Sequence, residues 1–384
     1  MSLHLKKYIF SVAGTTLFFF LFFQKNIHAQ TFPEVKVTGS ESRTITSSYV
    51  KGQEYLLQIS LPAGYATNNK KYPVVYLMDS QWDFPLVSAL YGQQYYDGFI
   101  PEMIIVGITW GGYHPNPDSL RARDYTPTTE KILPQSGQAN KFLECINKEI
   151  FPFIEENYRV DSTDRTLMGC SLGGLFTMYT LFTHPGMFNH YVAASPAFTW
   201  GNNVLYSYEK NYHESTSKLP AKLFMCVGGV ERGVPGFEKL TRFLQNRHYA
   251  NLQIESRVLE NTGHSGTKGE GYARGLQFIF KRRSLSLEPG LLKQYSGSYK
   301  LNGGMIINVQ SEGGRLTGSA GNVKDTLYAA STTDFYSWCW AEQGSPQLSA
   351  DRLYFIENKR RTSQDVRRSN LCACVFGPIR STSA

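Results

Sequence analysis

A Gly-x-Ser-x-Gly pattern at residues 169–173 is the clearest candidate for covalent chemistry in the sequence. It follows a short apolar stretch and precedes apolar residues at helical spacing, so Ser171 is expected at a sharp turn from strand to helix. Glycine two residues before and after the serine lets strand and helix approach without a Cβ clash. Such a turn presents the hydroxyl at a helix N-terminus, where the amide of Leu172 points toward a developing oxyanion. The pattern predicts a nucleophile for acyl transfer; a glycine-rich turn with a buried serine is the alternative.

A serine nucleophile needs a base to take its proton and a carboxylate to orient that base. Of the eight histidines, His264 follows a predicted strand at 253–259 and lies in a polar, glycine-rich loop. Three histidines between residues 184 and 213 come too early to follow an acid-bearing strand, and His248 ends a predicted helix. We therefore interpret His264 as the base, with an ordinary surface-loop histidine as the alternative.

The acid is expected in the loop after the preceding buried strand, residues 223–228, because the acid of such a triad precedes its histidine. Glu231 is the first carboxylate in that loop. The other nearby glutamates lie in the next helix or close to the strand that leads to the histidine: Glu238, Glu255 and Glu260. We predict Glu231 as the acid; a serine–histidine dyad with a loosely placed carboxylate is the alternative.

A second oxyanion donor is expected in the loop after an earlier central strand. The apolar run at 72–78 ends at Asp79, and the backbone amides of Ser80 and Gln81 follow directly. Either amide is a candidate for the second donor.

The elements that must position these residues alternate between buried strands and helices. Continuous apolar runs at 72–78, 103–108 and 223–228 are typical of strands that are buried on both faces, as in parallel sheets. Apolar residues at helical spacing lie between or after them, at 142–153, 172–182 and 237–244. This alternation predicts an α/β domain with a mostly parallel central sheet. Weak alternation at 35–37 and 55–59 predicts an antiparallel hairpin before it.

The first 29 residues have the features of a secretory signal peptide. Lys6 and Lys7 precede an apolar run at 9–23, and Ala29 ends a candidate cleavage site. An uncleaved anchor helix is the alternative, but the run is shorter than the ~20 apolar residues that a membrane span needs, which favours cleavage. We expect an exported protein, periplasmic or secreted, with no stable membrane span after cleavage.

The predicted domains are a signal peptide at 1–29, a catalytic domain at 30–283, a small β-rich domain at 287–358 and a basic tail at 359–384. The β-rich domain is predicted to be antiparallel because glycines interrupt short alternating segments.

Charge and composition exclude several classes of protein. The net charge of +8 comes from the two ends, because residues 281–384 carry 14 basic and 8 acidic side chains and residues 1–29 carry three lysines and no acid. A nucleic-acid partner is therefore not predicted. The chain has no Cys-x-x-Cys and no His-x-x-x-His, so no metal site is predicted, and the serine chemistry needs no cofactor.

The motifs together resemble the esterase family of the α/β-hydrolases, whose members include siderophore (enterochelin) esterases, feruloyl esterases and S-formylglutathione hydrolases. The resemblance covers about residues 45–280 and rests on four segments and a histidine: 72–79, 121–127, 151–160, 169–174 and His264. The Arg-x-Arg-Asp-Tyr-Thr-Pro segment at 121–127 is most similar to the exported, siderophore-esterase-like branch. The Tyr-Ser-Gly-Ser-Tyr segment at 295–299 resembles small C-terminal domains of exported bacterial hydrolases.

The resemblance implies an α/β-hydrolase fold with Ser171 as nucleophile, Glu231 as acid and His264 as base. It also implies that the amide of Gln81 is the second oxyanion donor, although Ser80 stands where relatives usually have glycine. We expect a serine hydrolase of a small-molecule carboxylic ester, of siderophore or carbohydrate-linked type, acting through an acyl-enzyme. An acyltransferase and a non-catalytic envelope- or carbohydrate-binding protein are the alternatives.

Cysteine and aromatic residues near the site have a structural and a functional interpretation. Cys170, beside the nucleophile, is predicted to fill space behind the turn rather than to react. Several aromatic residues follow strand ends, where they either line a substrate pocket or pack in the core: Trp82, Trp110, Tyr113 and Trp200.

Overall fold

The computed structural model describes residues 36–281, 284–300, 306–329, 332, 335–337 and 354–355. The predicted signal peptide and basic tail lie outside these residues. So do most of residues 330–358, the end of the predicted β-rich domain. The domain boundaries at 29, 283, 287 and 358 remain predictions.

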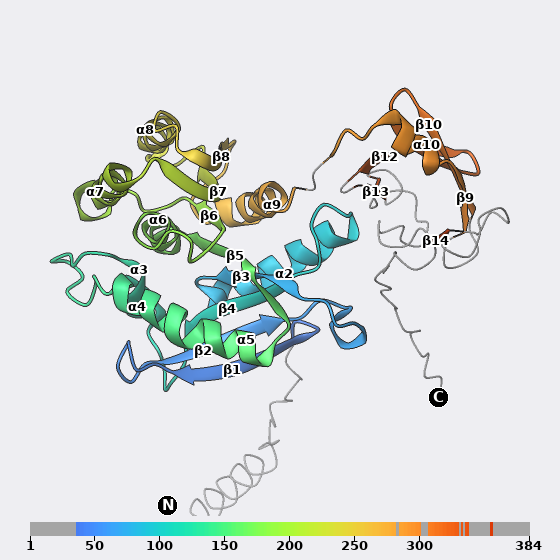
Figure 1. Cartoon of the computed structure of the whole chain (residues 1–384). Helices are drawn as coiled ribbons and strands as arrows, with labels where there is room; N and C mark the ends of the chain where they lie inside the picture. Colours follow the sequence, from blue (N-terminus) through green and yellow to red (C-terminus); the bar gives the residue numbers. More distant parts are fainter. Residues whose placement is uncertain are drawn as a thin grey trace, which may run out of the picture. The chain divides into compact units, whose positions relative to one another are not determined.

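An eight-stranded sheet forms the centre of the fold (Figure 1). In spatial order its strands are β1 (Ser40–Thr46), β2 (Glu54–Ser60), β4 (Ile104–Trp110), β3 (Tyr72–Leu77), β5 (Val160–Cys170), β6 (His190–Ala194), β7 (Lys218–Gly228) and β8 (Ala250–Leu259). The pairings of β1 with β2 and of β2 with β4 are antiparallel, and all the others are parallel. The predicted mostly parallel sheet is confirmed.

Burial explains why the central strands read as continuous apolar runs. Every residue of β4 is buried, as are five of the six residues of β3, because helices cover both faces of the sheet. The apolar runs at 72–78, 103–108 and 223–228 correspond to β3, β4 and the end of β7.

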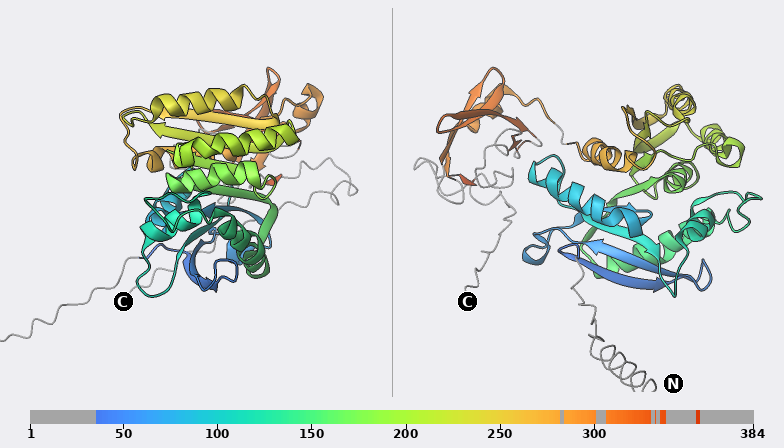
Figure 2. Two further views of the ribbon diagram at one scale, coloured as in Figure 1. Left: turned by 90° about the vertical axis from the view of Figure 1, so that its left-hand side faces the viewer. Right: turned by 180° about the vertical axis from the view of Figure 1, so that it is seen from behind.

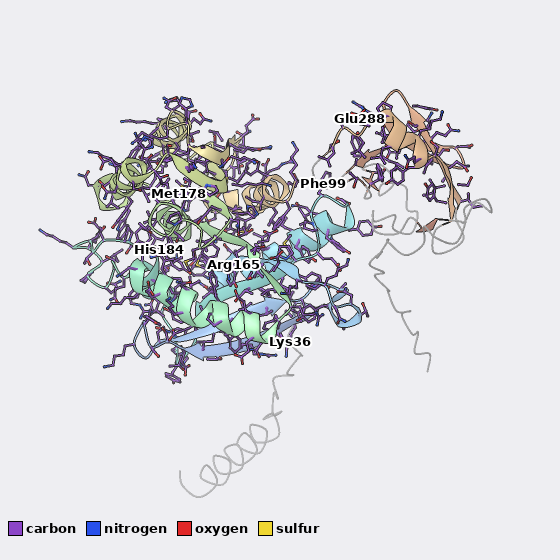
Figure 3. All side chains as sticks on the ribbon, viewed as in Figure 1. Lys36, Phe99, Arg165, Met178, His184 and Glu288 are labelled. Atoms are coloured by element: carbon purple, nitrogen blue, oxygen red, sulfur yellow. The ribbon has the colours of Figure 1, made fainter. Side chains whose placement is uncertain are left out.

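Two layers of helices pack on the sheet (Figure 2). One layer consists of α2 (Ser80–Tyr96) and α9 (Thr267–Ile279), which contact each other. The opposite layer contains α3 (Pro117–Tyr125), α4 (Ala139–Cys145), α5 (Phe151–Asn157), α6 (Leu172–Thr183), α7 (Trp200–Ser215) and α8 (Val234–Gln245). Figure 3 shows the side chains that fill this layer, among them the buried Met178 of α6.

Two local predictions differ from the structure. The first strand lies at Ser40–Thr46 and does not include residues 36 and 37, while residue 35 lies outside the described residues. Within this exposed edge strand only Ile45 packs on the core, so its sequence shows little apolar alternation. The predicted helix at 142–153 is interrupted by a π-helical turn at Ile146–Ile150. Pro152 lies just after that turn and has no amide hydrogen to continue the α-helical bonding, which accounts for the change in pitch.

A second, antiparallel sheet follows the helix α10 (Pro289–Gln294). It contains β9 (Gly297–Lys300), β10 (Ile306–Glu312), β11 (Arg315–Ala320), β12 (Val323–Ala329), β13 (Phe335–Tyr336) and β14 (Tyr354–Phe355), in the order β13-β12-β11-β10-β9-β14. Its small apolar core includes Leu292, Ile307 and Leu316. The predicted antiparallel β structure after residue 287 is confirmed.

Sheet register brings several distant loops together. Leu77 pairs with Met168, and Cys170 pairs with Ala194. Ala194 in turn pairs with Cys226, so the carboxyl ends of β3, β5, β6 and β7 lie at one edge of the sheet. The loops that follow these strands therefore meet, as expected at the ligand-binding edge of an α/β sheet.

Among the described helices, none has both the length and the apolar character needed to cross a bilayer.

Candidate active site

Ser171 lies at a sharp turn between β5 and α6, in the conformation φ 59°, ψ −116° that non-glycine residues rarely adopt. A Cβ atom on Gly169 would lie 2.6 Å from backbone atoms of Gly173, and one on Gly174 would lie 2.9 Å from Pro196 Cα. The turn thus needs its glycines because strand, helix and the next loop are in direct contact there.

The predicted acid and base are in contact. His264 Nδ1 lies 2.7 Å from Glu231 Oε2. Because an ionised carboxylate only accepts hydrogen bonds, Nδ1 donates. In the neutral imidazole this leaves Nε2 as the nitrogen that can take a proton. The alternative acids are placed elsewhere: Glu238 lies 3.9 Å from Arg242 on the surface of α8, and Glu255 pairs with Arg257.

Three donors surround the carboxylate of Glu231. Its Oε1 accepts from Ser195 Oγ at 2.6 Å and from the Gly228 amide at 2.8 Å, while Oε2 accepts from His264. Partial burial raises the pKa of Glu231, but the hydrogen bonds from Ser195, His264 and Gly228 outweigh it, so the pKa lies below its ordinary value. The carboxylate is held in its charged form.

The loop that carries Glu231 (the acid loop, residues 229–233) is hydrogen-bonded through its backbone to the loop that carries His264 (the histidine loop, residues 260–266). The Gly229 amide donates to Leu259 O at 2.7 Å, and the Val230 amide donates to Thr262 O at 3.2 Å. A Cβ atom on Gly228 would lie 2.2 Å from Thr262 O, so only glycine permits this approach.

Ser171 lies at the same sheet edge as this pair, but no hydrogen bond joins its hydroxyl to His264 in the part of the chain that the structure describes. Catalytic hydrogen bonds are often long without substrate and tighten in the complex.

The predicted oxyanion loop begins at Asp79, which has a left-handed backbone (φ 54°, ψ 36°) and precedes the first residue of α2. Among the described groups, the amides of Gln81 and Leu172 have no hydrogen-bond acceptor, as is usual in the first turn of a helix. The two loops are adjacent, because a Cβ atom on Gly173 would lie 3.2 Å from Met78 Cβ.

Ser80 stands where the family resemblance implies glycine, and the neighbouring strand accommodates it. A Cβ atom on Gly107 of β4 would lie 2.5 Å from Ser80 Cβ. The missing side chain at 107 therefore makes room for the side chain at 80.

Arg121 connects the oxyanion loop to the nucleophile turn. Its Nε and Nη2 donate to the two carboxylate oxygens of Asp79 at 3.0 and 2.8 Å, and Nη2 also lies 3.5 Å from Cys170 O. Burial raises the pKa of Asp79, although hydrogen bonding to Arg121 and its charge oppose that shift. The Tyr125 hydroxyl accepts from the Asp79 amide at 3.0 Å. These contacts account for part of the 121–127 motif.

A partly buried ion pair joins the helices α2 and α9. Lys268 Nζ lies 2.7 Å from Asp83 Oδ1, and the Tyr272 hydroxyl donates to Asp83 Oδ2 at 2.9 Å. Two cations lie near the ring of Trp82, whose centroid is 5.7 Å from Arg121 Cζ and 5.8 Å from Lys268 Nζ. Since α2 carries the oxyanion loop and α9 follows the histidine loop, this cluster ties the two loops together.

Of the aromatic residues near the strand ends, some are exposed, as a pocket lining would be, and others are held in the core. Trp82 and Tyr113 are exposed, at 49% and 93%. Trp110 is buried and donates from Nε1 to Asp124 at 2.7 Å, so it belongs to the core and not to a pocket. Trp200 Nε1 donates to Thr128 O at 3.1 Å.

Cys170 is buried, as predicted for a residue that fills space behind the turn, and burial raises the pKa of its thiol to about 12.

Several residues of this arrangement were not predicted from the sequence: Ser195, Asp83, Lys268 and Tyr272. One feature of the sequence could have indicated Ser195: it directly follows β6, at the sheet edge where the other site residues lie.

Among the described residues, no group of His, Cys, Asp and Glu side chains could hold a metal ion.

Comparison with known proteins identifies the family. The family described as "Putative esterase" matches residues 47–287. Ferri-bacillibactin esterase BesA of Bacillus subtilis is 29% identical over 211 residues, which cover 51% of this chain and 72% of that protein. The siderophore triacetylfusarinine C esterase of Aspergillus fumigatus is 29% identical over 178 residues, covering 44% and 60%.

Two solved structures are similar over most of their length. The BES protein from Bacillus cereus superposes with a TM-score of 0.58 at 27% identity, covering 65% of this chain and 98% of that chain. An IroE-like serine hydrolase from Shewanella oneidensis has a TM-score of 0.57 at 26% identity, covering 66% and 84%. The chain belongs to this esterase family and has its α/β-hydrolase fold.

Proposed function

We propose that this protein hydrolyses a carboxylic ester through an acyl-enzyme on Ser171, with Glu231 and His264 completing the triad. The observation that carries the proposal is the 2.7 Å contact between His264 Nδ1 and Glu231 Oε2, at the sheet edge where the strained turn presents Ser171. Membership of an esterase family supports the same chemistry.

The reaction follows from the placement of these groups. Ser171 Oγ attacks the ester carbonyl while its proton passes to His264 Nε2, and the carbonyl electrons move onto oxygen. The amides of Leu172 and Gln81 bind that oxyanion. As the tetrahedral intermediate collapses, the bond to the alcohol breaks and His264 returns the proton to the alcohol oxygen. Water then attacks the acyl-enzyme by the same route and releases the acid and free Ser171.

The carboxylate of Glu231 has two tasks in this scheme. It holds His264 in the tautomer that leaves Nε2 free, and its negative charge stabilises the imidazolium that forms in each step. The lowered pKa of Glu231 suits both tasks because the charge must persist throughout the cycle.

For the substrate we propose a siderophore-type ester, because the similar proteins BesA and the triacetylfusarinine C esterase are named for siderophore esters. The exposed ring of Trp82 follows Gln81 directly, so it can flank a ring or acyl chain of the bound ester. We also propose that the protein is exported, on the strength of the predicted signal peptide alone.

The test is hydrolysis of a short-chain nitrophenyl ester by Ser171→Ala. Loss of the nucleophile should lower kcat by about 10³-fold or more with folding intact. A burst of one equivalent of nitrophenolate from the unaltered enzyme would mark the acyl-enzyme. Ser42→Ala, an exposed serine on β1, is the control and should keep full activity. An active Ser171→Ala variant would reject the proposal, and transfer of the acyl group to an added alcohol in preference to water would make the protein an acyltransferase.

A second experiment separates Glu231 from the competing glutamates. Glu231→Gln should lower kcat by roughly 10²–10⁴-fold with a smaller effect on KM. Glu238→Gln and Glu260→Gln should be near neutral. A larger loss in either of these would move the acid, and small losses in all three would favour a Ser171–His264 dyad.

A further inference from the structure

Ser195 is buried beside the proposed triad in an unfavourable backbone conformation. It is the first residue after β6, only 4% exposed, with a φ of 38° in the left-handed region. Its amide donates to Cys226 O at 2.7 Å, which fixes it to β7, the strand that leads to Glu231. Non-glycine residues keep such conformations only where the surroundings hold them, often at functional sites.

The hydroxyl of Ser195 has two possible acceptors and a single proton. Glu231 Oε1 lies 2.6 Å away and Thr267 Oγ1 lies 3.2 Å away. The proton of Thr267 goes to His264 O, at 2.6 Å, so Thr267 does not compete for the carboxylate. A short bond to a charged acceptor is the stronger of the two, and Ser195 therefore donates to Glu231.

This bond, together with that from the Gly228 amide, fixes the plane of the carboxylate. The terminal torsion of a glutamate is broad and roughly two-fold when nothing restrains it. Here Ser195 and the Gly228 amide both bind Oε1, so Oε2 is the oxygen that faces His264. A turn of the carboxylate out of this plane would break both bonds to Oε1 together with the bond to the imidazole.

We propose that Ser195 is a positioning residue for the reaction, whose hydroxyl holds the Glu231 carboxylate so that Oε2 receives His264 Nδ1. The inference rests on the proposed function, because it assigns a role only if Glu231 orients His264. The side-chain hydrogen bonds of Ser195 run to Glu231 and Thr267, so Ser195 acts through Glu231, and its loss should change kcat and leave KM nearly unchanged.

The experiment is a double-mutant cycle in the full-length protein with a nitrophenyl ester as probe. Ser195→Ala should lower kcat by about 10- to 100-fold, the range expected for a bond to a charged group, with KM within about twofold. In the Glu231→Gln background the same substitution should have no further effect. Ser195→Gly suits the left-handed backbone and should lose as much kcat as Ser195→Ala, because both lack the hydroxyl. Thr180→Val, which removes a buried hydroxyl on α6, is the control and should keep wild-type kcat.

The outcomes separate this inference from the proposed function. Wild-type kcat in Ser195→Ala, or an equal loss in both backgrounds, would overturn the positioning role while leaving the triad intact. Full activity of Ser171→Ala in parallel assays would instead reject the proposed function itself. If Ser195→Ala proves unfolded in a thermal melt, Ser195→Gly decides the question, and wild-type kcat in that variant overturns the inference.

Discussion

Glu231 and Asp79 are two carboxylates at one sheet edge whose surroundings act on them differently. Glu231 is surrounded by three hydrogen-bond donors that together lower its pKa below the ordinary value. The dominant effect on Asp79 is burial, which raises its pKa. The difference suits their proposed roles, because Glu231 must respond to a charge that appears during the reaction, whereas Asp79 binds the permanently charged Arg121.

The lowered pKa of Glu231 predicts how stability depends on pH. A carboxylate whose pKa is lower in the folded than in the unfolded state contributes stability above the unfolded value, about 4.3, and loses it as pH falls through the folded value. The free energy of unfolding of the wild type should therefore fall relative to that of Glu231→Gln as pH drops below about 5. Urea unfolding of both proteins between pH 3 and 7 measures this, and parallel curves would show that the three donors do not act on the charge.

Cys170 adjoins the nucleophile but should be chemically inert. Burial raises the pKa of its thiol to about 12, so almost no thiolate exists at neutral pH, and the side chain is not accessible. Iodoacetamide at pH 7.5 should leave ester hydrolysis unchanged, and peptide mass mapping should find Cys170 unmodified until the protein is unfolded. Inactivation that tracks alkylation of Cys170 would contradict this.

At the scale of elements, the site depends on contacts between helices and loops distant in sequence. Arg121 of α3 ties the oxyanion loop to the end of β5, and Lys268 of α9 ties α2 to the histidine loop. Both sets of contacts fix the relative positions of loops that carry groups needed by the proposed mechanism. Positional errors of about 1 Å at such groups cost roughly 10²-fold in rate.

The clamp between α2 and α9 yields a test. Lys268→Met should lower the free energy of unfolding by about 2 kcal/mol, less than for a fully buried pair because the Lys268 side chain is 20% exposed. It should also lower kcat, because α2 carries Gln81. The double variant Asp83→Asn, Lys268→Met should recover part of the stability, since no unpaired charge is left buried. Urea unfolding and kcat of the wild type and the two variants check this, and a double variant less stable than Lys268→Met would contradict it.

The sequence allowed a correct prediction where a residue has both a distinctive type and a distinctive position relative to a strand. Ser171 and His264 each follow a strand in a glycine-rich turn, and the buried parallel strands appear as unbroken apolar runs. The exposed strand β1 left no such pattern and was misplaced. Ser195 and Thr267 are ordinary hydroxyl residues, and only the tertiary fold, which brings β6 and α9 beside the acid loop, gives them a distinctive environment. Asp83 and Lys268 are 185 positions apart, so their pairing had no local signature.

For the whole molecule, the two sheets have separate sets of core residues. The larger set belongs to the eight-stranded sheet, and the set that includes Leu292, Ile307 and Leu316 belongs to the C-terminal sheet. Leu285 forms its strand bridge with Ala329, inside the C-terminal part. Each sheet is thus stabilised by its own apolar residues.

This separation predicts that the C-terminal part is dispensable for the basic chemistry. A chain that ends at Arg283 should remain soluble and retain most of its kcat on a short-chain nitrophenyl ester, because β1 to β8 and all the proposed catalytic groups lie before that point. Size-exclusion chromatography and the esterase assay provide the measurement. Aggregation or loss of activity would show that the β-rich part completes the catalytic half.

The order of the loops after β5, β7 and β8 along the chain also determines when during synthesis the proposed triad can assemble. A ribosome produces the nucleophile turn first, the acid loop about 60 residues later and the histidine loop last, and domains fold as their segments emerge. Until β8 has left the exit tunnel and added to the sheet edge, the nascent chain holds a serine hydroxyl with no imidazole to deprotonate it. Ester cleavage by a translating ribosome complex would thus begin only after residue 264 is exposed, because the proposed triad stays incomplete until then.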